Sequence, residues 1–355
     1  MPSDDLLREA ERQMVVCNAC RYCEGYCAVF PAMELRTTFG KDDLLYLANL
    51  CFDCRDCYYA CPFAPPHQFA IDVPKVFAEL RSATYREYTG PAVVSRLLRS
   101  SWVVPLGLAV LAFALVLALQ GAGVLFGPSR SFYAVVPFLA MVVPAGALLA
   151  YSAAVLTVGG VRFWRETGVS ADRRAFVKAT KDALGLAYLR GGGAGCAYPG
   201  EAYGHARRWL HHLVFWGFLF DLASTTVAAI YNDVLGWVAP YPLLSVPVVL
   251  GTVGGVMLVV GCAGLLVLKA RSDRAPADRA MVLMDSAFLV LLLATSMTGL
   301  LLLAFRDTSA MGTLLTIHLG LVAGLFLTLP YGKFAHVVFR YAALVRHAVE
   351  EARAG

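Results

Sequence analysis

The sequence predicts an all-α protein in two parts, a small helical module over residues 1–100 and a bundle of six transmembrane helices over residues 101–355. Two observations lead to this prediction. Cysteines are concentrated at the start of the chain, and long apolar runs dominate it from Ser101 onward. Hydrophobic residues make up 59% of the chain, against about 45–50% in soluble domains. Most of the chain is therefore expected to lie in lipid.

Eight of the ten cysteines form two runs of identical spacing within the first 61 residues. In each run two gaps of two residues are followed by a gap of three, and Pro62 directly follows the second run. The first run is Cys17, Cys20, Cys23 and Cys27, and the second is Cys51, Cys54, Cys57 and Cys61. This spacing is typical of ferredoxins with two [4Fe-4S] clusters, in which the fourth cysteine of a run ligates the other cluster.

The spacing predicts which cysteines share a cluster. The first cluster is assigned to Cys17, Cys20, Cys23 and Cys61, and the second to Cys51, Cys54, Cys57 and Cys27. Structural zinc is the weaker alternative because zinc sites usually show two separated cysteine pairs. Disulfides would need an oxidising compartment. Cys196 and Cys262 stand alone and are expected to be packed thiols.

The segments around these runs favour an α-helical ferredoxin module over a βαβ ferredoxin. Residues 44–50 are apolar and unbroken by turn residues, and no β alternation is present. A second, amphipathic helix is expected from Pro74 to about Tyr85, leading the chain to the membrane.

Apolar runs that reach the length of about 20 residues needed to cross a bilayer predict six spans. They lie near 101–120, 133–158, 209–231, 243–268, 283–305 and 311–334. Lys and Arg crowd the connections 159–208 and 269–280, whereas the other three connections hold only Arg130 and Arg306. The positive-inside rule therefore places the first two connections, and both termini, in the cytoplasm. The start of the chain is acidic and has no apolar stretch, so no signal peptide is expected.

The basic balance, a net charge of +5, is accounted for by this topology and requires no nucleic-acid partner. The long connection is expected to form a short amphipathic helix capped by Ser170, followed by a glycine-rich stretch at 191–195. No strand precedes these glycines and no Gly-Lys-Ser/Thr follows them. A flexible loop is therefore favoured over a phosphate-binding loop.

Histidines are the second chemical signal, because ionisable residues inside a membrane usually have a functional role. Five of the seven lie at predicted membrane boundaries or inside spans: His205, His211, His212, His318 and His336. Two imidazoles from two helices are a typical ligand pair for haem b. The predicted depths match for His212 and His336, whereas His318 lies about 27 Å from His336 along a helix.

His211 is the alternative to His212, because adjacent residues of a helix point about 100° apart. For any of these histidines taken singly, a structural role in the core is the competing interpretation.

At this point the chain resembles known families. Residues 317–336, with two histidines at this spacing, resemble the last helix of the cytochrome b subunit of respiratory nitrate reductase. Over residues 10–350 the chain is more similar to the tricarballylate and citrate utilisation B proteins, through segments 61–69, 195–199 and 205–212. The same architecture forms the second half of an oxygen-dependent cobalamin-biosynthesis flavohaemoprotein.

The resemblance implies a multi-pass electron carrier of the bacterial inner membrane. Its expected partner is a cytoplasmic FAD-dependent dehydrogenase, whose reduced flavin it reoxidises through two iron-sulfur clusters and haem b, with membrane quinone as the acceptor. The dehydrogenase would act on an acid of the tricarballylate or citrate type.

One departure from the nitrate-reductase cytochrome concerns a second haem. In that family a second histidine follows the first by ten residues, and the corresponding residue here is Leu222. His318 is therefore expected to serve a quinone site instead, with Asp221 near mid-bilayer as its partner. The alternative for Asp221 is a carboxyl group hydrogen-bonded to Thr295 and Ser296.

The chain contains no Rossmann fingerprint, nucleophile elbow or cluster of substrate-binding carboxylates. No catalytic residue is assigned, and oxidation of the organic substrate is expected on another polypeptide. Two other functions remain open: an O2-linked haem and iron-sulfur component of cobalamin biosynthesis, and a non-enzymatic membrane redox sensor.

Overall fold

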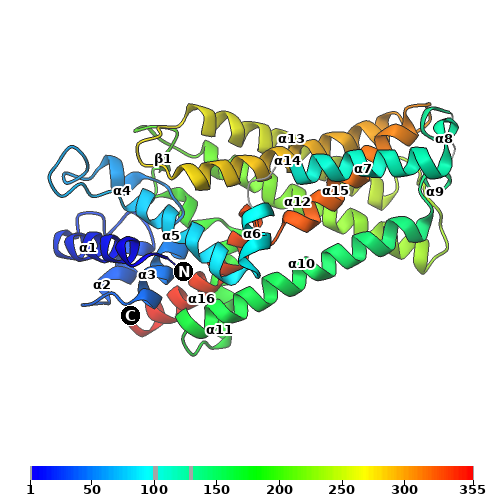
Figure 1. Cartoon of the computed structure of the whole chain (residues 1–355). Coiled ribbons are helices and arrows are strands. Elements are labelled where there is room, and N and C mark those ends of the chain that lie inside the picture. The colour runs from blue at the N-terminus through cyan, green and yellow to red at the C-terminus, as the bar shows by residue number, and fades with distance from the viewer. Residues whose placement is uncertain (1, 99–102, 128–130, 355) are drawn as a thin grey trace.

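The computed structural model describes residues 2–98, 103–127 and 131–354. Helices dominate the described chain, which confirms the predicted helical class (Figure 1). Within these residues the strands are limited to β1 (Cys196–Ala197) and β2 (Tyr203–Gly204), which pair antiparallel.

The N-terminal module consists of short helices that follow the cysteine runs. They are α1 (Asp4–Cys20), α2 (Val29–Glu34), α3 (Lys41–Leu50), α4 (Asp56–Tyr59) and α5 (Val73–Tyr88). Helix α5 contains the amphipathic segment predicted from Pro74. The side chain of Asp72 accepts a hydrogen bond from the backbone N–H of Lys75, and Pro74 lies in the first turn, so this helix begins with two favoured start residues.

Five described helices are long and apolar enough to cross a membrane, and they mark the chain as a membrane protein. They are α10 (Phe138–Thr167), α12 (Ala206–Asp233), α13 (Val246–Arg271), α14 (Arg279–Ala304) and α15 (Met311–Thr328). The remaining predicted span corresponds to α7 (Val103–Gln120), whose apolar part, Leu106–Gln120, is shorter. The six-helix bundle is therefore supported for five members, and α7 as a sixth span stays a prediction.

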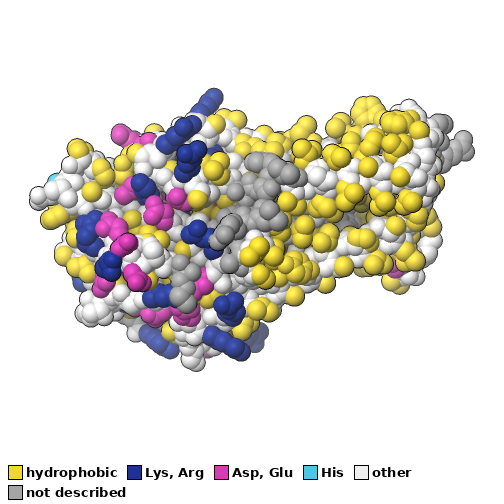
Figure 2. Space-filling view, in the orientation of Figure 1, with side chains coloured by type: hydrophobic (Ala, Val, Ile, Leu, Met, Phe, Trp, Pro, Cys, Tyr) yellow, Lys and Arg dark blue, Asp and Glu magenta, His cyan; other side chains and the backbone are white. Residues whose placement is uncertain are grey.

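Hydrophobic side chains cover the elongated helical part of the molecule, whereas Lys, Arg, Asp and Glu gather over the N-terminal module (Figure 2). Both chain ends lie in this charged part (Figure 1). Short helices α8 (Ala122–Phe126) and α9 (Phe132–Val135) lie at the opposite end of the bundle, and α6 (Ala92–Leu98) follows α5.

The structure corrects the last predicted span, 311–334. Helix α15 ends at Thr328, a 3-10 turn η2 (Lys333–Ala335) follows, and helix α16 (His336–Ala354) then begins. Pro330 has no backbone N–H to continue the helix, and Gly332 adopts an extended conformation. His318 and His336 therefore lie on two different helices.

Helix α16 is part of the core of the N-terminal module. Buried residues of α3, α5, α10, α11 (Arg173–Leu184) and α16 form one hydrophobic cluster. A compact ion-pair network reinforces it: Arg346 contacts Asp43 at 2.6 Å and Glu350 at 2.9 Å, and Arg36 contacts Asp43 at 2.7 Å. The predicted division at residue 100 is not tested by this packing, but the C-terminal helix clearly packs with the first part of the chain.

The connection between α10 and α12 also differs in detail from the prediction. Helix α11 is capped by Asp172, whose side chain accepts from the N–H of Ala175 at 2.9 Å, and not by Ser170. A 3-10 helix η1 (Ala187–Arg190) then leads to the glycine-rich stretch.

Helices α7 and α15 pack closely at Gly320. A methyl group on Gly320 would collide with the backbone of Ala109. Gly146 of α10, by contrast, faces open space. Close helix approach at small residues is a general feature of membrane bundles.

We predict that Gly320→Ala destabilises the protein by about 1–3 kcal/mol, because α7 and α15 would have to separate. Thermal unfolding of the detergent-solubilised protein, followed by circular dichroism, measures the effect. Gly146→Ala is the matched control and should leave the midpoint unchanged or raise it. Equal midpoints for the two variants would contradict the close packing.

Candidate functional site

The eight clustered cysteines lie in the loops between the helices of the N-terminal module. Cys17 and Cys20 lie in the last turn of α1, and Cys23 and Cys27 follow in the loop before α2. The second run begins directly after α3 and surrounds α4, from Cys51 to Cys61. These short loops allow residues distant in sequence to approach each other.

Five cysteines line one cavity: Cys17, Cys20, Cys23, Cys57 and Cys61. Three of them come from the first run, and Cys57 and Cys61 come from the second. Burial and the neighbouring thiols of Cys61 and Cys20 raise the pKa of Cys17 to about 12. The sequence analysis assigned Cys17, Cys20, Cys23 and Cys61, here called the first cysteine group, to the first cluster and Cys57 to the second, and this assignment stays a prediction.

Cys27 lies with the second run. A hydrogen bond with Cys27, together with burial, raises the pKa of Cys54 well above its usual value. Burial raises the pKa of Cys57 too, and the neighbouring thiols of Cys54, Cys51, Cys23 and Cys17 add to this. We refer to Cys27, Cys51, Cys54 and Cys57 as the second cysteine group, and their ligation of one cluster stays a prediction.

The identity of the ligand remains a prediction. In the described part of the chain, no three His, Cys, Asp or Glu side chains converge on a single metal-ion position. Backbone donors do face the sulfurs, since the N–H of Asp53 lies 3.4 Å from Sγ of Cys51 and that of Phe63 lies 3.3 Å from Sγ of Cys61. Such N–H···S bonds favour the thiolate and tune iron-sulfur centres, so the donor set fits cluster ligation.

The glycine-rich stretch covers the second cysteine group. The N–H of Ala197 donates to the buried carboxyl group of Asp56 at 2.7 Å, and a methyl group on Gly191 would collide with that carboxyl group. Gly191 also has a φ of 55°. Cys196 is fully buried, with Sγ 3.4 Å from the carbonyl of Leu189, as expected for a packed thiol. Packing on Asp56 is the role that the sequence did not reveal.

His211 and His336 face each other across the ends of α12 and α16. Their ring centroids are 6.3 Å apart, and the ring planes are nearly perpendicular, at 84°. A metal ion between two imidazoles lies about 2 Å from each nitrogen, and each ring centre lies about 1 Å further, which gives about 6 Å between centroids. The observed separation fits a shared metal.

The Nδ1 atoms of His336 and His211 differ in their surroundings. Nδ1 of His336 lies 2.6 Å from the carbonyl oxygen of Lys333. This contact assigns the proton to Nδ1 and leaves Nε2 free, the arrangement usual for metal-ligating histidines. Nδ1 of His211 is buried without a hydrogen-bond partner among the described residues.

His212, our first choice from the sequence, points elsewhere. Its ring lies against Trp209, with centroids 5.7 Å apart. The geometry therefore favours the alternative, His211, as the partner of His336. The predicted depth in the membrane could not distinguish His211 from His212, because the rotation of the helix about its axis decides which of two adjacent residues points inward. The haem itself stays a prediction.

His318 and Asp221 have different neighbours. Nδ1 of His318 lies 3.1 Å from the hydroxyl oxygen of Thr298 and 3.1 Å from the carbonyl oxygen of Thr295, both on α14. Asp221 lies on α12 beside Gly254 of α13. Within the described chain no hydrogen bond joins the two side chains, so their pairing at a quinone site gains no support.

The alternative for Asp221 is not observed either. Thr295 and Ser296 donate to carbonyl oxygens of their own helix, at 2.8 Å and 2.9 Å. Leu222, which replaces the second histidine of the nitrate-reductase cytochrome, is 45% exposed on the surface of α12.

Three arginines hold the second cysteine loop, and two of them, Arg207 and Arg340, lie on the helices that carry the histidine pair. Arg207 donates to the carbonyl oxygens of Phe52, at 3.1 Å, and Asp53. Arg340 donates to that of Cys51 at 2.7 Å. Arg207 precedes His211 by one helical turn and Arg340 follows His336 by one turn, so the same two helices carry the loop contacts and the facing histidines.

The third arginine, Arg81 of α5, donates to the carbonyls of Ala48 and Cys51 at 3.0 Å and 3.3 Å. The loop that these bonds hold is strained, since Asp53 and Arg55 have φ values of 56° and 68°. The arginine bonds stabilise a conformation that non-glycine residues rarely adopt.

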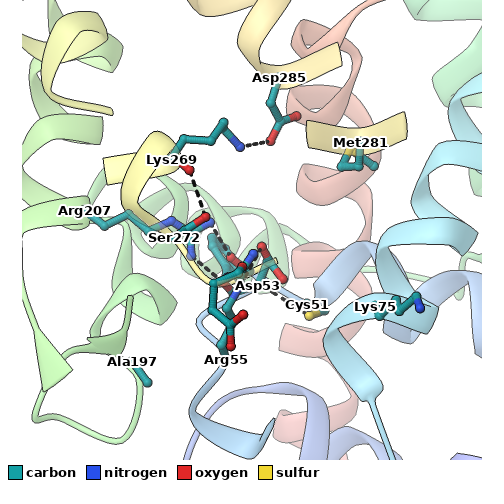
Figure 3. A network of polar contacts seen from close by, with 12 residues as sticks. Cys51, Asp53, Arg55, Lys75, Ala197, Arg207, Lys269, Ser272, Met281 and Asp285 are labelled. Carbon is teal, nitrogen blue, oxygen red and sulfur yellow. Dashed lines mark hydrogen bonds and ion pairs between the residues drawn. The ribbon is translucent and has the colours of Figure 1, made fainter. Parts of the chain in front are cut away.

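A buried ion-pair triad lies beside His336. Asp285 of α14 contacts Nζ of Lys269 at 3.0 Å and Nζ of Lys333 at 2.9 Å. Figure 3 shows Lys269 and Asp285 in the same region as Arg207 and the loop of Cys51 and Asp53. The triad fixes η2 against α13 and α14, and so fixes the start of α16.

These features define a class: a helical membrane protein whose charged module carries two ferredoxin-type cysteine runs. Family models identify the particular family. "Citrate utilization protein B" matches residues 93–355, and its "Fer4-like domain" matches residues 10–87. The chain belongs to the citrate utilization protein B family.

A curated relative agrees with this assignment. The Citrate utilization protein B of Escherichia coli is 49% identical over 351 residues, which is 97% of this chain and 93% of the relative. No solved structure matches the chain significantly.

We predict that Gly191→Ala loosens the contact between the glycine-rich stretch and Asp56, because the new methyl group collides with the carboxyl group at a positive φ. The expected cost is about 1–3 kcal/mol. Gly200→Ala, at a glycine with open space around it, is the control. Limited proteolysis within residues 185–205 measures the loosening, and identical cleavage rates in both variants would refute it.

Proposed function

We propose that this protein carries electrons from the reduced FAD of a cytoplasmic dehydrogenase to membrane quinone, through two [4Fe-4S] clusters and haem b. The observation that supports this most is the pair of arginines, Arg207 and Arg340. Each hydrogen-bonds the second cysteine loop and lies one turn from a histidine of the facing pair. The two candidate cofactor sites are thus held together by the same helices.

The residues present fit the proposed groups. Cys17, Cys20, Cys23 and Cys61 would hold one cluster, Cys27, Cys51, Cys54 and Cys57 the other, and His211 and His336 the haem. When bound, these groups supply one-electron carriers, whereas a reduced flavin delivers two electrons. The chain itself supplies the ligands, the backbone donors to sulfur and the buried cations around them.

The first cysteine group is the better candidate to face the dehydrogenase. Cys20 is exposed, and the side chain of Tyr22 beside it is 63% exposed. Cys51 and Cys54 of the second group are buried. An electron donor in solution could therefore approach the first group directly at Cys20.

The substrate class of the dehydrogenase is proposed from the name of the relative, which points to citrate utilisation. The acid would be oxidised on the partner, so this chain needs no substrate pocket of its own. The charged distribution of the connections supports a bacterial inner-membrane protein with both termini in the cytoplasm, where reduced thiols persist.

We predict that Cys20→Ser and Cys54→Ser each remove or alter one of two iron-sulfur signals in electron paramagnetic resonance spectra. Each should also reduce quinone reduction at least tenfold in membranes supplied with photoreduced FAD, because both centres lie on the route. Cys262→Ala, a cysteine isolated in α13, is the control and should retain both signals. Full activity in either serine variant would reject the relay.

We predict that His211→Ala abolishes the Soret absorption of the purified protein, because the iron would lose one of its two imidazoles. His212→Ala should retain the band, since that ring lies against Trp209. The opposite pattern would restore His212 as the ligand. Absence of the band in the unaltered protein would reject the haem while leaving the iron-sulfur centres to be tested separately.

A further inference from the structure

Arg81, Arg207 and Arg340 are buried cations, and Asp53 acts electrostatically on Arg81 and Arg207 without forming an ion pair with either. Their guanidinium groups donate to backbone carbonyl oxygens of the second cysteine loop and its approach from α3. Within the described chain none of the three forms an ion pair with Asp or Glu. Burial lowers the pKa of Arg340 to about 10, as expected for a cation without an anionic partner.

The other charges near this loop do not cancel these cations. Asp53 lies 3.8 Å from Arg55, a fourth arginine, which also donates to the carbonyl of Asp273 at 2.8 Å. The carboxyl group of Asp56 accepts from Ala197. Asp72 also interacts electrostatically with Arg55. Arg81, Arg207 and Arg340, which form no ion pair, are buried charges of the kind that needs a compensating anion.

Among the described residues, no Lys or Arg lines the cavity of the first cysteine group. The cavity formed by Cys17, Cys20, Cys23 and Cys61 is otherwise lined by Cys57 and by apolar or aromatic side chains and a proline: Val16, Tyr22, Phe30, Pro62, Phe63, Ile71 and Val73. Arg21 follows Cys20, but it is exposed and donates to the carbonyl oxygen of Asn18 at 3.1 Å. The two groups therefore differ sharply in the charge around them.

Charge around a redox centre sets its reduction potential, because the reduced form carries one more negative charge. Nearby cations stabilise that form, the more so where water is excluded. Four thiolates around a cluster would also supply the negative charge that compensates the three buried arginines.

We propose that Arg81, Arg207 and Arg340 raise the reduction potential of the centre held by Cys27, Cys51, Cys54 and Cys57 above that of the centre held by Cys17, Cys20, Cys23 and Cys61. One electron then leaves the first centre, which is oxidised, and enters the second, which is reduced, with no bond broken and no proton moved. The direction is toward His211 and His336. This inference rests on the proposed iron-sulfur function.

The order of the two potentials is the first test. The purified full-length protein is titrated with a reductant while both iron-sulfur signals are followed by electron paramagnetic resonance. Cys20→Ser and Cys54→Ser identify which signal belongs to which centre. We expect the signal altered by Cys54→Ser to be reduced first, at the higher potential. The reverse order would overturn the inference whatever the arginine variants show.

The second test removes one charge. Arg340→Gln should lower the reduction potential of the second centre relative to that of the first. The equilibrium of one electron between the two centres should then shift at least tenfold toward the first. A tenfold shift corresponds to about 59 mV for one electron. Arg340→Lys keeps the charge and should retain most of the difference. Arg173→Gln removes an exposed charge from α11 and should change neither potential. Arg81→Gln repeats the test if Arg340→Gln does not retain the second centre.

The outcomes separate the inference from the function on which it rests. A purified protein without iron and sulfide for two centres would reject the proposed function. Two centres of the expected order that shift in Arg340→Gln but not in Arg173→Gln support the inference. If Arg340→Gln changes the potentials of both centres equally, or if neither Arg340→Gln nor Arg81→Gln changes the potential of the second centre, the inference is rejected. The electron-transfer function is then left intact.

Discussion

The hydrogen bonds from buried guanidinium groups to the backbone of the second cysteine loop are the interactions on which the rest of this structure depends. Arg207 and Arg340 hold the carbonyls of residues 51–53 from two helices of the bundle side, and Arg81 holds them from the module side. Arginine suits this task because its planar donors can bond several carbonyl oxygens at once. The same hydrogen bonds therefore attach the N-terminal module to the bundle and position the second cysteine loop.

The position of α16 follows from the same constraint. Its first residue, His336, faces His211, its second turn contributes Arg340, and its last turns contribute Arg346 and Glu350 to the ion-pair network with α3. The turn at Pro330 makes this possible, because a continuous helix from α15 would carry these residues away along one axis. Asp285 then fixes the turn through Lys269 and Lys333.

Much of this arrangement could be predicted from the sequence, because the signals were periodic or compositional. The cysteine spacing predicted that the two runs exchange their fourth cysteines, and in the structure Cys61 lies near Cys17 and Cys27 lies near Cys54. The assignment of all eight ligands stays a prediction. Apolar runs located the five long membrane helices. These features depend on residues near one another in sequence or on runs of about 20 residues.

The remainder depended on rotation and on long-range contacts. His211 and His212 differ only in the direction in which α12 presents them, and no local signal sets that direction. The break between α15 and α16 lies within an apolar stretch that reads as one span. The glycines at 191–195 read as a loop, whereas their contact with Asp56 joins residues far apart in the chain. Contacts of this kind arise from the assembled fold and leave no pattern in sequence.

The contribution of α16 to the module has a consequence for biosynthesis. A ribosome makes the cysteine runs first and α16 last, so the nascent N-terminal segment emerges without the helix that completes its core. Until the whole chain has been released, the cysteine loops lack Arg340 and the ion pairs of Arg346. The core of this region can therefore be completed only after the helices that precede α16 in the chain have been synthesised.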